Sequence, residues 1–204
     1  MSVNEQAAVD LIIPSVRKAA IAEQKYIMAS LVLAFHNDPT IRWLYSDAYR
    51  YLSYFPQFVQ AFSGKAFDQN TVYCTEDYTG AALWYPPGIE PDIEAIVQVI
   101  QQSVFEAAQE DVFAVFEQME RYHPQYPLWY LTFIGVEPIQ QRRGYGIALI
   151  DPVLEQCDRD RLPAYLESSN PANLPFYQRH GFEVIGTIQA GNSPQIFPML
   201  RHPR

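Results

Sequence analysis

The chain has 204 residues, of which 49% are hydrophobic and 18% are charged. This balance supplies enough apolar surface for a sizeable core, so it excludes a disordered or fibrous protein. Acidic residues outnumber lysines and arginines by 23 to 14, for a formal charge of -9. That charge argues against nucleic acid as a partner, because a phosphate backbone requires a basic surface. We expect one domain over residues 1–204.

Two cysteines, Cys74 and Cys157, are too few for a disulfide framework or a four-thiolate zinc site. We expect both to be small buried hydrophobes. The four histidines show no metal-ligand spacing, so no metal is expected. No signal peptide and no stretch of transmembrane length is visible, which predicts a cytoplasmic protein with no membrane partner.

The first part of the chain predicts two helices followed by a β-hairpin. Apolar residues recur at helical spacing in two segments, and two short runs rich in β-formers follow them around a turn. The expected elements are a helix over 22–35 ended by Pro39, a helix over 47–67 kinked or broken at Pro56, and strands over 71–75 and 81–85.

The rest of the chain predicts alternating strands and helices after a helical interruption. Two amphipathic helices, 92–107 and 109–121, separate the hairpin from the next strand, so residues 89–127 are expected to be an insertion. The elements expected after it are strand 128–136, helix 144–160, strand 164–168, helix 173–180, and strands 182–188 and 195–200.

The connection between strand 128–136 and the helix after it carries most of the chemical information. The chain turns at Pro138, and a loop containing Gly144 and Gly146 opens the helix. Such a loop directs backbone N–H groups and the helix N-terminus toward one concavity, which suits an anion. Arg142 and Arg143 add positive charge. A plain tight turn is the alternative, and the glycine and lysine patterns of dinucleotide and nucleoside triphosphate loops are missing.

At this loop the sequence resembles the GCN5-related N-acetyltransferases, or GNAT family. Residues 141–146, QRRGYG, match the family signature Q/R-x-x-G-x-G/A, and Val136-Glu137-Pro138 precede them as in the family. Residues 170–182 are similar to a second signature, an asparagine followed by Y-x-x-x-G-F. The resemblance is specific over 129–186 and weaker over 29–88. It implies an α/β fold with a mixed, mostly antiparallel sheet, whose central parallel strand pair splays apart between flanking helices.

The resemblance also implies acetyl-CoA as co-substrate. The family binds its pyrophosphate with the backbone of the loop, which here places it on Gln141, Arg142, Arg143, Gly144, Tyr145, Gly146 and Ile147. The family pairs the pantetheine arm with the preceding strand, here Phe133, Ile134, Gly135 and Val136. Gly135 would keep that slot open. Asn173 could bind the same arm or cap its helix, and Asn170 is the competing match to the family's asparagine.

Two side chains are candidates for proton transfer. Tyr177 matches the tyrosine that many family members use as a general acid toward the CoA thiolate, and a core tyrosine is the alternative. Glu167, on a strand facing the expected cleft, is the candidate general base, and a structural strand-end carboxylate is its alternative. Glu76 and Asp77 are weaker candidates, and water could relay the proton instead.

The acceptor site is expected to be aromatic. Trp84, Tyr85 and Phe35 could form a wall that binds an amine by cation–π contact, and ordinary core packing is the alternative. The predicted function is acetyl transfer from acetyl-CoA to the amine of a small molecule or peptide, by direct attack in a ternary complex, in a monomer or homodimer. The alternatives are another acyl-CoA donor, a hydroxyl acceptor, or a CoA-binding sensor without turnover.

Overall fold

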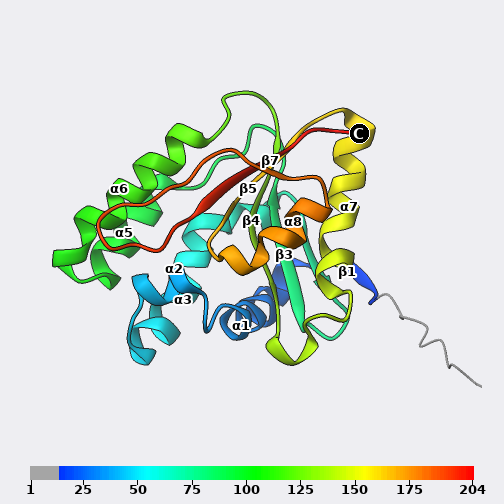
Figure 1. The fold of residues 1–204 in the computed structure, drawn as a ribbon. Coiled ribbons are helices and arrows are strands. Elements are labelled where there is room, and N and C mark those ends of the chain that lie inside the picture. Colours follow the sequence, from blue (N-terminus) through cyan, green and yellow to red (C-terminus); the bar gives the residue numbers. More distant parts are fainter. Residues whose placement is uncertain (1–13) are drawn as a thin grey trace, which may run out of the picture.

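The computed structural model describes residues 14–204, which form a seven-stranded sheet with helices on both faces (Figure 1). The strand order is β1-β2-β3-β4-β5-β7-β6. The strands are β1 (Val16–Lys18), β2 (Val72–Thr75), β3 (Gly80–Tyr85), β4 (Trp129–Val136), β5 (Ala164–Ser168), β6 (Glu183–Val184) and β7 (Phe197–Arg201). The expected hairpin, central strand and short strand are therefore confirmed.

The parallel pair at the centre of the sheet is β4 with β5, and the other pairings within residues 14–204 are antiparallel. β4 pairs with β5 over three residues, Trp129–Leu131 against Ala164–Leu166. Beyond them, residues 133–136 continue to pair with β3 but have no partner on β5. The sheet is thus mostly antiparallel with a central parallel pair that separates, as the resemblance implied.

The helices divide between the two faces of this sheet. The helices are α1 (Gln24–Ala34), α2 (Pro39–Leu44), α3 (Ala48–Ser63), α4 (Lys65–Asp68), α5 (Ile93–Ser103), α6 (Glu106–Tyr122), α7 (Tyr145–Asp160) and α8 (Leu174–Arg179), with short 3₁₀ turns η1 (Ile21–Glu23), η2 (Pro138–Gln140) and η3 (Pro171–Asn173). The core on one face joins α1, α3 and α5 to the sheet, and the core on the other face joins α7 and α8 to it (Figure 1). Alternate residues of each strand supply the two cores.

Several parts of the chain differ from the elements that the sequence predicts, and strand β1 is one that it did not predict. Pro39 does follow the end of the first helix, but it is also the first residue of α2, where its missing N–H has no consequence. The Asp38 carboxylate caps α2 by accepting hydrogen bonds from the N–H groups of Thr40 (3.1 Å) and Ile41 (3.0 Å). The helix expected at 47–67 runs unbroken through Pro56, and the division falls at Gly64 instead.

The expected strand over 182–188 is also shorter in the structure. β6 has two residues, and beyond it a bridge between Ile188 and Ile196 joins the chain to the segment before β7. Between them the chain crosses toward α6, where the side-chain amide of Gln118 donates to the carbonyl of Gln189 at 2.9 Å. Cys74 and Cys157 are free and buried, as predicted. No helix within 14–204 has the length and apolar character of a membrane span.

Candidate active site

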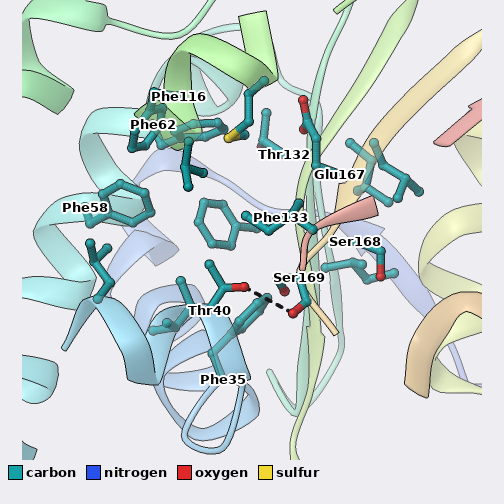
Figure 2. A pocket seen from close by; sticks show the side chains of 18 of the residues that line it. Phe35, Thr40, Phe58, Phe62, Phe116, Thr132, Phe133, Glu167, Ser168 and Ser169 are labelled. Carbon is teal, nitrogen blue, oxygen red and sulfur yellow. Dashed lines mark hydrogen bonds between the residues drawn. The ribbon is translucent and has the colours of Figure 1, made fainter. Parts of the chain in front are cut away.

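A cavity of about 120 Å³ lies where β4 and β5 separate (Figure 2). Thr132 and Phe133 of β4 face it, and Glu167 and Ser168 of β5 line it from the other strand. The remaining walls come from α1, α2, α3, α6 and α8, through residues that include Phe35, Thr40, Phe58, Phe62, Phe116 and Tyr177. The opening beyond the last paired residues of β4 and β5 thus becomes a site with one polar side.

Glu167 is the carboxyl group of this cavity. Its Oε2 accepts a hydrogen bond from the hydroxyl of Tyr130 at 2.6 Å. Burial raises the pKa of Glu167 to about 7, while the hydrogen bond from Tyr130 acts in the lowering direction by stabilising the carboxylate. A carboxyl group with such a pKa can take up and release a proton near neutral pH. This is the raised pKa that the sequence predicted for a carboxylate beside an apolar cleft.

Tyr177 of α8 lines the same cavity and is 7% exposed. Burial raises the pKa of its hydroxyl, so the group stays protonated at neutral pH. Within residues 14–204 its hydroxyl makes no hydrogen bond that would hold it away from a ligand. The structure therefore brings the predicted acid and the predicted base, Tyr177 and Glu167, to one cavity.

Two hydrogen bonds that the sequence did not suggest join the start of α2 to the residue that follows β5. The hydroxyl of Ser169 donates to Asp38 Oδ2 at 2.6 Å, and the hydroxyl of Thr40 donates to the Ser169 carbonyl at 3.2 Å (Figure 2). Asp38 is also the N-cap residue of α2. Its long-range contact with Ser169 has no local signal, because the two residues lie 131 positions apart.

The glycine-punctuated loop presents unsatisfied hydrogen-bond donors. Within residues 14–204, none of the backbone N–H groups of residues 142–147 donates a hydrogen bond to the protein. Two loop residues have left-handed backbone conformations, Arg142 at φ +62° and Gly144 at φ +85°. Arg142 and Arg143 are exposed and form no ion pair within this part of the chain. Such a run of donors at the start of α7 suits an anionic group such as a pyrophosphate.

Two glycines that were expected to make room for a ligand make room for the protein instead. A Cβ on Gly135 would lie 2.6 Å from the Cβ of Ala34, so this glycine allows α1 to pack against β4. A Cβ on Gly146 would lie 3.3 Å from Cζ of Phe176. Within residues 14–204, a Cβ on Gly144 would make an ordinary van der Waals contact with Pro14 Cδ at 3.7 Å and would meet no other atom within 4 Å. Gly144 is therefore the loop glycine at which an added side chain is least hindered by the described part of the protein.

The expectation that Trp84 and Tyr85 bind the acceptor is wrong. β3 lies inside the sheet with helices over both faces, and both side chains are 0% exposed. Trp84 packs under α7, and the Tyr85 hydroxyl donates to the Phe62 carbonyl at 2.9 Å on the opposite face. Neither residue lines the cavity. They are the core aromatics that the sequence left as the alternative.

Four of the other predicted ligand contacts line the cavity, whereas Gly135, Val136 and the loop residues 141–147 do not. Phe35 and Asn173 line it together with Phe133 and Ile134. Asn173 makes no capping hydrogen bond to α8, while Asn170 caps η3 by accepting from the Ala172 N–H at 3.0 Å. The two candidate asparagines therefore differ: the Asn170 side chain is used as a cap, whereas the Asn173 amide is available to a ligand. Among the described residues, no three histidine, cysteine or acidic side chains are grouped as metal ligands.

A mixed sheet whose central parallel strands separate beside an anion-binding loop defines an acetyltransferase fold of the GNAT class. The family model described as "Acetyltransferase (GNAT) domain" matches residues 75–202. Because the match covers more than half of the 204 residues, the chain belongs to the GNAT acetyltransferases. The resemblance to this family is therefore confirmed.

Related proteins extend this comparison. The chain is 40% identical over 78 residues, 37% of its length, to an uncharacterized N-acetyltransferase of Schizosaccharomyces pombe, and the matched part is 32% of that relative. The fold is similar to a Corynebacterium glutamicum structure named histone acetyltransferase HPA2 and related acetyltransferase, with TM-score 0.68, 22% identity, and 95% and 98% of the two chains covered. It is also similar to an Aedes aegypti arylalkylamine N-acetyltransferase, with TM-score 0.66, 12% identity, and 93% and 99% covered.

Proposed function

We propose that this acetyltransferase moves the acetyl group of acetyl-CoA to an amine by direct attack in a ternary complex. The observation that carries the proposal is the separation of β4 from β5, together with six consecutive N–H groups, those of residues 142–147, that donate no hydrogen bond within residues 14–204. The first feature leaves a strand edge for an extended arm, and the second binds a pyrophosphate at the end of that arm.

Acetyl-CoA would be bound by the loop before α7 and by the free edge of β4. The loop from Gln141 to Gly146 with Ile147 would bind the phosphates, and Arg142 and Arg143 would add charge attraction. The edge of β4 from Phe133 to Val136 would pair with the pantetheine arm, and Asn173 would contact it. Acetyl-CoA supplies a thioester, whose carbonyl carbon is open to attack by an amine.

Tyr177 and Glu167 would carry out the proton transfers of this reaction. Glu167 would accept a proton from the acceptor ammonium, which frees the nitrogen lone pair for attack. A carbon–nitrogen bond forms, the carbon–sulfur bond breaks, and Tyr177 would donate a proton to the departing sulfur. The nitrogen loses two protons and the sulfur gains one, so one proton leaves to solvent in each turnover. The two groups share one cavity, which supports this division of roles.

The acceptor belongs to the small-molecule or peptide amines. Solved relatives carry names that cover a wide range: polyamines in a Drosophila melanogaster enzyme with 15% identity and TM-score 0.63, and arylalkylamines in the mosquito protein. This spread follows from a fold that fixes the acyl donor and leaves the acceptor side variable. Cytoplasmic location and a monomeric or homodimeric state stay predictions.

Calorimetric titration with acetyl-CoA tests the proposal through Gly144. Gly144→Val places a side chain on the loop that would bind the pyrophosphate, at a position where the Cβ touches only Pro14 within residues 14–204, and acetyl-CoA binding should be lost. Gly88→Val is the matched control: its φ of +84° imposes the same backbone strain, and nothing lies within 4 Å of its added Cβ. Both variants should lose about 1–3 kcal/mol of stability. Equal affinity of the folded Gly144→Val variant and wild type would refute the placement of acetyl-CoA.

A further inference from the structure

A second, larger cavity of about 780 Å³ lies between α5, α6 and the turns on either side of this helical pair. Its walls are mainly apolar and include Ile96 and Val97 of α5, Phe113 and Phe116 of α6, and Tyr126 before β4. This volume falls in the range of small-molecule sites, about 300–1,000 Å³. The expected insertion, 89–127, therefore builds a cavity that a minimal domain would lack.

The second cavity meets the first at Glu167. Both cavities are lined by Phe62, Phe116, Met119, Tyr130 and Glu167. A molecule in the second cavity can therefore bring one end to the Glu167 carboxyl from the side of α5 and α6. The opening between β4 and β5 reaches the same carboxyl through the first cavity. Two cavities that share a carboxyl group are what a transfer between two bound molecules requires.

The second cavity carries carboxyl groups and no opposing cation. Its ionisable lining residues are Glu90, Glu117, Glu120, Glu167 and His123, with tyrosines but neither lysine nor arginine. Burial lowers the pKa of His123, so the ring is neutral at neutral pH. Glu117 is ion-paired with Arg121 at 2.5 Å, whereas Glu120 has no ion-pair partner within residues 14–204. The cavity therefore attracts a cation.

We propose that this cavity is the acceptor site and that the acceptor is a primary amine on an apolar alkyl or aryl body. The inference rests on the proposed function and names its substrate class. The ammonium group would be drawn by the carboxylates and delivered to Glu167, while the apolar body fills the space beside Val97 and Phe113. The apolar walls disfavour a peptide, whose backbone amides would lose their hydrogen bonds there. They also disfavour a polyamine, because each of its several charges would have to be desolvated along those walls, whereas a monoamine brings one charge.

Steady-state thiol release with 2-phenylethylamine tests the site through two variants. Glu120→Lys reverses the charge of an exposed lining residue, and Val97→Trp fills part of the cavity. Each should raise the KM for 2-phenylethylamine by about tenfold or more, with the KM for acetyl-CoA within about twofold of wild type. Glu110→Lys is the matched control, because it makes the same charge change at an exposed residue of α6 that lines neither cavity. Its KM should match the wild type.

An acceptor panel completes the test. With wild type, kcat/KM for 2-phenylethylamine and octylamine should exceed that for spermidine and for a lysine-containing peptide. Preference for spermidine or the peptide, or an unchanged KM in Glu120→Lys, overturns the inference; if calorimetry still shows acetyl-CoA binding, the proposed function stands. If acetyl-CoA does not bind to wild type, the proposed function fails and this inference falls with it. Should Val97→Trp not fold, Glu120→Lys decides the question alone.

Discussion

At the scale of single residues, Glu167 and its neighbour Tyr130 determine how the site responds to pH. Burial favours the neutral carboxylic acid and brings the pKa to about 7, and the Tyr130 hydroxyl favours the carboxylate. A base must be ionised before it can accept a proton, so kcat/KM should rise with pH through the pKa of Glu167 in the free enzyme. The pH profile of an accepted amine therefore reports on this one group.

We predict that Tyr130→Phe moves the midpoint of this profile upward, by about one pH unit. The variant removes a hydrogen bond to the charged form, and such bonds contribute about 1.5–3 kcal/mol. Tyr85→Phe is the control, because it removes another buried tyrosine hydroxyl, bonded at 2.9 Å to the Phe62 carbonyl, that does not contact Glu167. A midpoint that stays in place in Tyr130→Phe, or a pH profile that persists in Glu167→Gln, would contradict Glu167 as the base.

We predict that Tyr177→Phe slows acetyl transfer by roughly 10²-fold while leaving acetyl-CoA affinity and stability nearly unchanged. The ring and its packing remain, and the hydroxyl makes no hydrogen bond within residues 14–204, so the variant removes only a proton donor. Single-turnover transfer to an accepted amine measures the effect. Tyr73→Phe, on β2 and away from the cavity, serves as the comparison. A Tyr177→Phe rate equal to wild type would leave Tyr177 as a packed core residue.

At the scale of secondary-structure elements, the contact of α1 with β4 is set by the absence of a side chain at Gly135. The strand and the helix approach closely enough that an added Cβ would collide with Ala34, Phe35 and Leu31. This contact also holds Phe35 at the cavity wall. The spacing between α1 and β4 therefore affects both stability and the shape of the site.

We predict that Gly135→Ala destabilises the protein by about 1–3 kcal/mol, because overpacking forces α1 away from β4. The nearest atom is the Ala34 Cβ at 2.6 Å, so Ala34→Gly should recover part of the loss despite its own cost in helix propensity. Urea unfolding of wild type, both single variants and the double variant gives the coupling energy. Additive effects of the two changes would mean that the collision is relieved in another way.

At the scale of the whole molecule, burial of the Glu167 carboxyl group lowers the free energy of unfolding by an amount that depends on pH. Glu167 has an ordinary pKa of 4.5 when exposed and about 7 in the folded chain. Between these values the folded chain holds a proton that the unfolded chain has released, so the free energy of unfolding falls as pH rises from about 4.5 to 7. Full ionisation then costs up to about 3 kcal/mol.

We predict that Glu167→Gln is more stable than wild type at pH 8 by about 2–3 kcal/mol, and that the difference largely disappears at pH 5. Urea unfolding at the two pH values measures it. Glu155→Gln, which makes the same substitution at an exposed residue of α7, is the control. If the Glu167→Gln difference is the same at pH 5 and pH 8, Glu167 does not have a raised pKa in the folded protein.

Local signals in the sequence predicted most of the elements and the chemistry of the loop. Helical and alternating periodicity gave α1, α3, α5, α6 and α7, because each pattern depends on residues a few positions apart. The glycines and arginines at residues 142–146 predicted an anion-binding turn for the same reason, and the structure shows free N–H donors there within residues 14–204. α2 was missed, because Pro39 ends one helix and begins the next, and the cap at Asp38 distinguishes the two. β1 was missed as well, because its three residues are too few to show an alternating pattern.

The tertiary structure decided which residues face a ligand and which face the core. Trp84 and Tyr85 are aromatic residues of the kind that line binding sites. However, β3 lies inside the sheet, so their side chains are buried on its opposite faces. The pairing of Asp38 with Ser169, the meeting of two cavities at Glu167 and the separation of β4 from β5 all join residues far apart in the chain. Periodicity records which side of an element is apolar, whereas contact with a ligand depends on what packs against that side.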